Sequence, residues 1–141
     1  MTKVAINGLG RIGRSALKIL LQYPELQLVA VNDIAPADNL AYLLNFDTVY
    51  GKAENRVWSD PDNLYINGKR IPLFSKKNPS ELPWRDMDID IVLECTGKFT
   101  TREELQKHID AGAKRVILSA PAKSNDIITI VHGVNRPEGE S

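Results

Sequence analysis

Residues 7–14, NGLGRIGR, place three glycines at the spacing Gly8-x-Gly10-x-x-Gly13, directly after the apolar-alternating stretch KVAI. Glycines at this spacing, between a strand and a helix, permit a tight turn, the close approach of a pyrophosphate and close packing of the helix on the strand. The helix then presents free N–H groups to the anion. We therefore expect Gly8, Gly10 and Gly13 to bind the phosphates of a dinucleotide, with a purely structural glycine turn as the alternative.

An acidic residue stands where a dinucleotide site requires one. Asp33 lies about twenty residues beyond Gly13, at the end of the next predicted strand, where its carboxylate can bind ribose hydroxyls. A carboxylate repels a 2′-phosphate, so we expect NAD as the cofactor. NADP stays an alternative if Lys77, or a residue outside this sequence, offsets that repulsion.

Small residues follow two later predicted strands, CTG at residues 95–97 and SAP at residues 119–121. They leave room for a flat ring and offer hydroxyl and backbone groups, so we expect them to line the nicotinamide half of the site. Cys95 has two interpretations, a nucleophile or a small buried apolar residue. No histidine lies near it in the sequence, which favours the apolar interpretation.

The other candidate side chains are two histidines and a pair of lysines. His108 falls inside a predicted helix and is expected at the surface or its boundary, and His132 ends a strand, either in the core or at the rim of the site. Neither histidine receives a catalytic role. Lys76 and Lys77 are typical of a solvated pair, although Lys77 could reach an adenine or a phosphate. With one cysteine in the chain, no cluster of metal-ligand spacing forms and no metal is expected.

Alternating strands and helices are predicted to position these residues. A strand at 3–7 precedes the glycines. YPE at 23–25 ends the helix after the glycines, and a strand at 26–33 completes a βαβ unit. The apolar face of that first helix is predicted to be Ile12, Ala16, Ile19 and Leu20.

The second half of the sequence repeats the alternation. DIDIVLECTG, residues 88–97, predicts a strand, and KRVILS and IITIVHG predict two more. A helix is expected over 101–111. Thr101 and Glu104 are predicted to form its capping box, and Gly112 is predicted to be its C-terminal cap. Leu105 and Ile109 are predicted to lie on its apolar face.

The middle of the chain, residues 46–85, departs from this pattern, and hairpins are expected there. Asn67 and Gly68 suit the positive φ angles of a type I′ turn. Pro72 cannot donate a ladder hydrogen bond, so its strand is expected at an edge. Before this region, Asp38 is expected to cap a short helix that carries Leu40, Leu43 and Leu44.

The order of elements predicts an α/β fold, a Rossmann-type, doubly wound, mostly parallel sheet with a hairpin-containing excursion in the middle. With 141 residues, 43% of them apolar, the chain has the size of one domain, residues 1–141. Lys and Arg number 18 and balance 18 Asp and Glu, which argues against nucleic acid or a membrane surface as partner. No signal peptide and no bilayer-length apolar run are found, so we expect a cytoplasmic protein.

In order along the chain, VAINGLGRIGR, VND, LPW, DIVLECTG, HIDAGAKRVILSAPAK and GVN resemble the N-terminal half of the phosphorylating glyceraldehyde-3-phosphate dehydrogenases. The resemblance covers almost the whole chain. It implies that Lys77 lies near the adenine and Asp33 at the adenosine ribose. The residues implied at the phosphates are Asn7, Gly8, Gly10, Arg11 and Ile12. Those implied on the nicotinamide side are Cys95, Thr96, Gly97 and Ser119.

The resemblance also implies a chemistry. In this family a cysteine in a later Ser-Cys-Thr-Thr-Asn segment attacks an aldehyde phosphate, a later histidine activates it, and the product is an acyl phosphate. Neither residue is expected within residues 1–141, so the chain should be inactive alone, and the full-length enzyme is expected to be a tetramer. The alternatives are erythrose-4-phosphate dehydrogenase, which shares most of these motifs, and a stand-alone NAD-binding module without catalysis.

Overall fold

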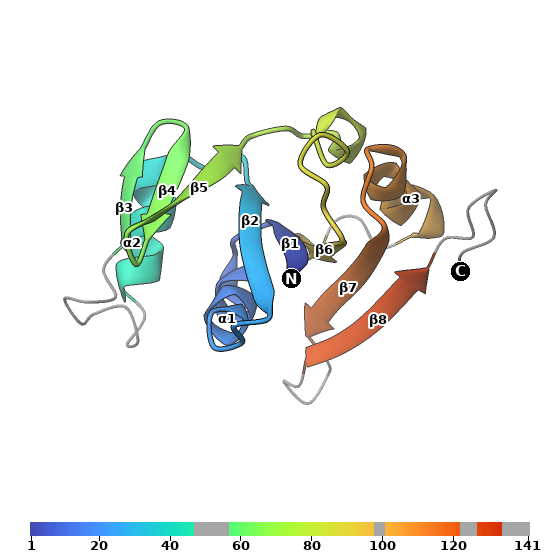
Figure 1. The fold of residues 1–141 in the computed structure, drawn as a ribbon, viewed down its shortest axis with the longest axis horizontal. Coiled ribbons are helices and arrows are strands. Elements are labelled where there is room, and N and C mark those ends of the chain that lie inside the picture. Colours follow the sequence, from blue (N-terminus) through green and yellow to red (C-terminus); the bar gives the residue numbers. More distant parts are fainter. Residues whose placement is uncertain (47–56, 98–100, 122–126, 134–141) are drawn as a thin grey trace.

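The computed structural model describes residues 1–46, 57–97, 101–121 and 127–133. Strands and helices alternate along most of these ranges, as Figure 1 shows. In chain order they are β1 Thr2–Asn7, α1 Arg11–Leu20, β2 Leu26–Asn32, α2 Ala37–Phe46, β3 Val57–Asp60, β4 Asn63–Ile66, β5 Lys69–Phe74, the 3-10 helix η3 Pro79–Glu81, β6 Ile91–Glu94, α3 Arg102–Asp110, β7 Arg115–Pro121 and β8 Ile127–Gly133.

The strands form one sheet in the order β3-β4-β5-β2-β1-β6-β7-β8. Central β1 pairs in parallel with β2 on one side and with β6 on the other, and β7 continues the parallel run beyond β6. The antiparallel strands β3, β4 and β5 extend one side of the sheet, and antiparallel β8 forms the opposite edge (Figure 1). The predicted Rossmann-type, mostly parallel sheet with a hairpin excursion is confirmed.

Apolar side chains cover both faces of the sheet. On one face, α1 packs against β1 and β2 and α2 packs against β3 and β4, and Leu17 and Leu44 are fully buried there. On the other face, the segment around Trp84 packs against Ala5 and Val92, and α3 packs on β7. The sheet is therefore the middle layer of three, as a doubly wound fold requires.

The buried stripe of α1 differs from the predicted one. Leu20 is buried, and Ile12 and Ala16 pack against the core as predicted. Ile19, however, is 53% exposed, whereas Leu17, one turn after Gly13, is fully buried. The spacing of apolar residues fitted two overlapping stripes, and contact with β1 and β2 selects the one centred on Leu17.

The tight turn between β4 and β5 is confirmed. Asn67 and Gly68 adopt φ angles of 54° and 79°, which a type I′ turn needs at both central positions. The flanking residues Ile66 and Lys69 face each other in the antiparallel ladder. Because both strands meet at this turn, it fixes the register of the hairpin.

The prediction that Pro72 lies on an edge strand is wrong, because β5 lies between β4 and β2. The N–H of Leu73 donates to the carbonyl of Asp62, on the β4 side, at 2.9 Å. Backbone N–H groups of successive strand residues point to opposite sides, so the nitrogen of Pro72 faces β2. Pairing between β2 and β5 begins only at Val31 and Leu73. The proline therefore interrupts no ladder bond and fits an interior strand.

The helix ends follow local side chains. At the start of α3, Thr101 accepts the backbone N–H of Glu104 while Glu104 accepts that of Thr101, which is the predicted capping box. After α3, Gly112 has a φ of 122°, and a Cβ there would lie 2.3 Å from the backbone nitrogen of Arg85. Asp38 lies inside the first turn of α2 and does not cap it, because that helix begins at Ala37. Among the described helices, none has the length and apolar content needed to cross a membrane.

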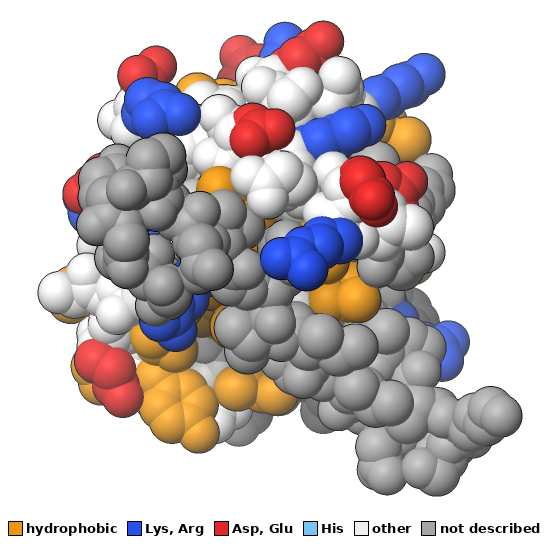
Figure 2. All heavy atoms as spheres, turned by 90° about the vertical axis from the view of Figure 1, so that its right-hand side faces the viewer, with side chains coloured by type: hydrophobic (Ala, Val, Ile, Leu, Met, Phe, Trp, Pro, Cys, Tyr) orange, Lys and Arg blue, Asp and Glu red, His pale blue; other side chains and the backbone are white. Residues whose placement is uncertain are grey.

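A small charged cluster joins the start of β6 to its neighbours. One oxygen of Asp90 accepts the backbone N–H of Lys3 at 2.8 Å, and the other accepts the ammonium of Lys114 at 2.9 Å. The Lys3 N–H, and after it Lys114, hold the pKa of Asp90 below its ordinary value of 3.8. On the face in Figure 2, acidic and basic side chains also lie side by side, without a large area of one sign.

We expect the contribution of Asp90 to stability to depend on pH. Because its pKa is lower in the folded chain than in the unfolded one, its carboxylate stabilises the fold above about pH 4, and this stabilisation is lost as the pH falls through the folded-state pKa. Asp90→Asn should lower the free energy of unfolding at neutral pH by about 1 kcal/mol. Urea unfolding at neutral pH and at about pH 3 measures this.

The control is Asp86→Asn, which alters an exposed carboxylate four residues earlier and should change little at either pH. A deficit for Asp90→Asn that is as large in acid as at neutral pH would show that the ionised carboxylate is not the stabilising form.

Candidate functional site

A pocket of about 530 Å³ opens at the carboxyl ends of β1, β2 and β6. The chain runs from β1 to β2 on one side and later to β6 on the other, so the strand order reverses at β1. Open α/β sheets bind ligands at this kind of switch point. The lining residues are Asn7, Gly8, Gly10, Asn32, Asp33, Ile34, Lys76, Lys77, Cys95 and Thr96.

The three glycines of the loop after β1 have different steric roles. A Cβ at Gly13 would lie 1.8 Å from the carbonyl oxygen of Gly8, so α1 approaches the end of β1 too closely for any side chain. Gly8 has a φ of 97°, and a Cβ there would lie 2.7 Å from the Thr96 side chain. A Cβ at Gly10 would meet no atom within 4 Å. Gly8 and Gly13 therefore permit the packing, and Gly10 leaves space toward the pocket.

The first turn of α1 is open to a ligand. Its N-cap is Gly10, which supplies no side-chain hydrogen bond, and the turn contains no acidic residue. The first helical hydrogen bond runs from the Arg14 N–H to the Gly10 carbonyl at 2.9 Å. Uncapped N–H groups at a helix start carry a partial positive charge. The geometry favours an anion at this end of the pocket.

Asp33 lies across the pocket and connects β2 to the glycine loop. Its Oδ2 accepts the N–H of Leu9 at 2.7 Å, and its Oδ1 accepts the N–H of Ala35 at 2.8 Å. The carboxylate keeps further acceptor positions, since each oxygen has two. Lys77 also lines the pocket, its side chain is exposed, and it forms no ion pair with any residue that the structure describes. A negative and a positive group therefore lie at the same end of the pocket.

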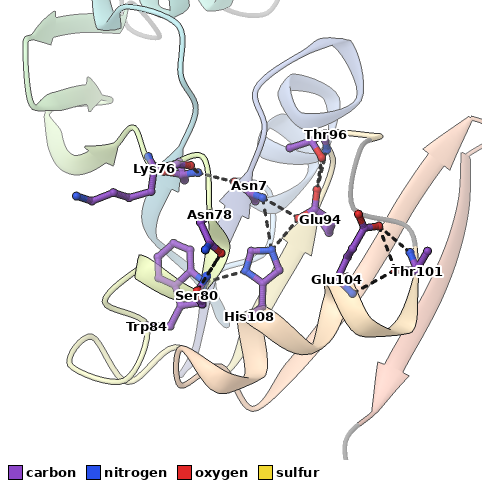
Figure 3. A network of polar contacts seen from close by, with 11 residues as sticks. Asn7, Lys76, Asn78, Ser80, Trp84, Glu94, Thr96, Thr101, Glu104 and His108 are labelled. Carbon is purple, nitrogen blue, oxygen red and sulfur yellow. Dashed lines mark hydrogen bonds and ion pairs between the residues drawn. The ribbon is translucent and has the colours of Figure 1, made fainter.

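Buried polar side chains lie directly beneath the pocket, where three parallel strands end. Asn7 of β1 is level with Asn32 of β2 and with Glu94 of β6. Asn32 Nδ2 donates to Asn7 Oδ1 at 2.7 Å, and Asn7 Nδ2 donates to Glu94 Oε1 at 2.7 Å. Glu94 Oε2 accepts both the backbone N–H and the hydroxyl of Thr96 (Figure 3).

The prediction that His108 lies at the surface is wrong, because its side chain is fully buried. Its Nε2 lies 2.7 Å from Glu94 Oε1, and its Nδ1 lies 3.0 Å from Trp84 Nε1 (Figure 3). The two rings lie edge to edge, with centroids 6.4 Å apart and planes 26° from parallel. A histidine in a polar helix resembles a surface residue in sequence, and only the partners contributed by β6 and the Trp84 segment explain its burial.

Cys95 is buried and packs in the apolar cluster beneath α1, which is the predicted environment of a small apolar residue. It also reaches the pocket wall next to Thr96. The side chain of His132 lies outside the described part of the structure, although its backbone pairs with Val116 in the sheet. Within the described ranges, no group of His, Cys, Asp and Glu side chains could hold a metal ion.

The structure brings most of the predicted site residues to the pocket. Those in its lining are Asn7, Gly8, Gly10, Asp33, Lys77, Cys95 and Thr96. The others lie beside it, since Arg11, Ile12 and Gly13 form the start of α1, and Gly97 directly follows Thr96. Ser119 lies in β7, paired with Thr129, and its side chain is outside the described residues.

Sequence reasoning missed Asn32, Ile34 and Glu94. A signal existed for two of them, because Asn32 follows the apolar run at residues 28–31 and Glu94 follows the apolar residues of β6. Buried polar groups at strand ends need partners, and three adjacent strands that end in this way supply them to one another. Ile34 carried no such signal. Lys76 lines the pocket together with Lys77, whereas from the sequence a ligand contact was considered for Lys77 alone.

The fold and the pocket define a Rossmann-type nucleotide-binding domain, with a glycine loop, an open helix start and an acidic residue at the end of β2. Residues 2–102 match the family described as glyceraldehyde 3-phosphate dehydrogenase, NAD binding domain. The chain belongs to the glyceraldehyde-3-phosphate dehydrogenase family, in which it corresponds to the NAD-binding domain.

Curated relatives carry the same name. The chain is 49% identical over 134 residues to glyceraldehyde-3-phosphate dehydrogenase of Geobacillus stearothermophilus. The matched region covers 95% of this chain and 40% of the relative. It is 50% identical over 133 residues to glyceraldehyde-3-phosphate dehydrogenase 1 of Bacillus subtilis strain 168, with 94% and 39% covered. The chain is 46% identical over 138 residues to glyceraldehyde-3-phosphate dehydrogenase of Clostridium pasteurianum, and this match covers 98% of this chain and 41% of that relative. The chain thus spans about two fifths of the length of these relatives.

We expect alanine to destabilise the fold strongly at Gly13 and to have little effect at Gly10. At Gly13 the new Cβ would overlap the Gly8 carbonyl oxygen, so α1 must move away from β1. Despite the higher helix propensity of alanine, this should cost about 3 kcal/mol or more of unfolding free energy. At Gly10 the new Cβ points into open space, and the change should stay below about 1 kcal/mol.

Urea unfolding of the two variants, followed by circular dichroism, compares these costs. Gly10→Ala is the matched control, because it makes the same substitution three residues earlier in the same loop. Equal destabilisation by the two substitutions would contradict the steric roles described for the two glycines.

Proposed function

We propose that the pocket at the ends of β1, β2 and β6 binds NAD, with the phosphates at the start of α1 and the adenosine ribose at Asp33. The observation that carries this proposal is the presence of an uncapped helix start and a carboxylate at the same pocket. Gly10 leaves open space between them, where a pyrophosphate can approach the backbone. The pocket also falls in the volume range of cofactor sites.

Individual contacts follow from the positions of the lining residues. The N–H groups of Arg11, Ile12 and Gly13 face the phosphates, and Asp33 accepts from the ribose hydroxyls through its remaining lone pairs. Lys77 lies beside the adenine end. Asn7 acts from beneath the loop, since its side chain is buried in hydrogen bonds. The nicotinamide side is formed by Cys95, Thr96, Gly97 and Ser119.

NAD is proposed over NADP because of the charge at Asp33. A 2′-phosphate would be placed beside this carboxylate, which repels it. Lys77 lines the same pocket and is a candidate for a compensating charge, but its ammonium is exposed to water. Screening by water and salt reduces the effect of an exposed charge.

For the whole protein, we propose an enzyme that oxidises an aldehyde phosphate and joins it to inorganic phosphate to give an acyl phosphate, in the cytoplasm and as a tetramer. NAD supplies a hydride acceptor when bound. The attacking cysteine and the histidine that activates it are proposed to lie outside residues 1–141, which form a single cofactor domain that is inactive alone. Support comes from the buried position of Cys95, packed among core residues beside the pocket, and from the names of the relatives.

We predict that the 141-residue chain binds NAD more tightly than NADP in calorimetric titrations at one fixed salt concentration. Asp33→Asn removes the charge but keeps one acceptor oxygen. It should weaken NAD binding by about tenfold or more and reduce the preference for NAD over NADP, because a charged hydrogen bond to the ribose is lost and the repulsion of the 2′-phosphate is relieved.

Asp86→Asn, which alters a carboxylate away from the pocket, should leave both affinities unchanged. Failure of the unaltered chain to bind either nucleotide would contradict the proposed function. Unchanged NAD binding in Asp33→Asn would contradict the ribose contact alone.

A further inference from the structure

We propose that Glu94 is a positioning residue of the dinucleotide site, which fixes the nicotinamide wall of the pocket from beneath without touching the ligand. The proposal rests on the proposed function, because it concerns the NAD pocket. Glu94 is fully buried and is absent from the pocket lining, so any effect on binding must pass through its neighbours.

Four donors surround the Glu94 carboxylate. Oε1 accepts Asn7 Nδ2 and His108 Nε2, each at 2.7 Å. Oε2 accepts the backbone N–H of Thr96 at 3.0 Å and also the Thr96 hydroxyl. These four donors match the four acceptor positions of a carboxylate, and a neutral amide in its place would bring an NH₂ group against two of them.

The bonds to Thr96 hold both its backbone and its side chain. Thr96 lies in the wall of the pocket, two residues after the end of β6. A Cβ at Gly8 would lie 2.7 Å from the Thr96 side chain, so Thr96 also sits tightly against the glycine loop. Glu94 therefore sets the geometry where the glycine loop and the nicotinamide wall meet.

Trp84 and His108 fix the other side of the carboxylate. The indole N–H of Trp84 can only donate, so His108 Nδ1 accepts it and the ring proton is on Nε2. That proton points to Glu94 Oε1. Because both ring nitrogens are bonded and the ring is fully buried, the imidazole has little freedom to turn. The carboxylate is thus held from outside the site by groups that do not reach the pocket.

The adenine side depends less on Glu94. Asn7 Oδ1 accepts from Asn32, and Asn32 binds the backbone of Lys76 twice, with its Oδ1 accepting the Lys76 N–H and its Nδ2 donating to the Lys76 carbonyl, each at 2.9 Å. These bonds do not include Glu94. Loss of the carboxylate should therefore disturb the Thr96 wall more than the wall that carries Lys76 and Lys77.

A purely structural role would give a different result from a positioning role. A buried charged network is not in itself the most stable arrangement, since well-packed apolar residues can equal it. General loosening of the fold would weaken every ligand of the pocket equally. Positioning of the Thr96 wall predicts a selective loss for ligands that carry the nicotinamide.

The test is calorimetric titration of Glu94→Gln with NAD and with ADP-ribose, which lacks the nicotinamide. We expect NAD binding to weaken by about tenfold or more and ADP-ribose binding by less than about threefold. Glu103→Gln makes the same chemical change at an exposed position of α3 and should alter neither affinity. Circular dichroism and urea unfolding establish that the variants are folded.

Trp84→Phe serves as the second variant if Glu94→Gln does not fold. It keeps an aromatic ring but removes the donor that orients His108, and it should weaken NAD more than ADP-ribose by a few-fold. Equal weakening of both ligands, or unchanged NAD binding in a folded variant, would overturn the positioning role. Failure of the unaltered chain to bind either ligand would overturn the proposed function instead, and this inference with it.

Discussion

The close contact between the end of β1 and the start of α1 is the constraint on which the rest of the site depends. A Cβ at Gly13 would lie 1.8 Å from the Gly8 carbonyl oxygen, so the helix can begin where it does only because residue 13 has no side chain. This contact brings the uncapped start of α1 over the carboxyl ends of the strands. Asp33 then holds the same loop from β2 through the Leu9 N–H. Sterics place the helix, and one carboxylate fixes the loop that joins it to the sheet.

A second layer of the site lies beneath the first. Asn32, Asn7 and Glu94 end three adjacent strands at one level and bond to each other in sequence. Such buried polar groups lower stability unless every donor and acceptor is used, and His108 and Thr96 complete the set around Glu94. The hydrogen bonds of the network fix the orientations of its side chains, whereas an apolar core would supply only packing contacts. A pocket that must present backbone N–H groups and a carboxylate at fixed positions benefits from such rigid support.

Much of the fold could be predicted from the sequence because its signals are local. Asn67 and Gly68 specify a turn by their own backbone preferences, and Thr101 specifies a helix start by its own side chain. Pro72 and His108 were misplaced because their environment depends on strands and segments distant in sequence. The glycine loop and the end of β2 were likewise visible in the sequence. The Glu94 network was not, because its members come from β1, β2, β6 and α3 and meet only after the sheet has formed.

The central claim is that a dinucleotide lies between the open start of α1 and the Thr96 wall. The most direct measurement is a titration of the ¹⁵N-labelled chain with NAD, followed through its backbone amide resonances. We expect the amides of Arg11, Ile12 and Thr96 to shift, and those of the hairpin turn at Asn67 and Gly68 to stay unchanged. Shifts that leave the start of α1 unaffected, or that centre on the β4–β5 hairpin, would contradict the claim.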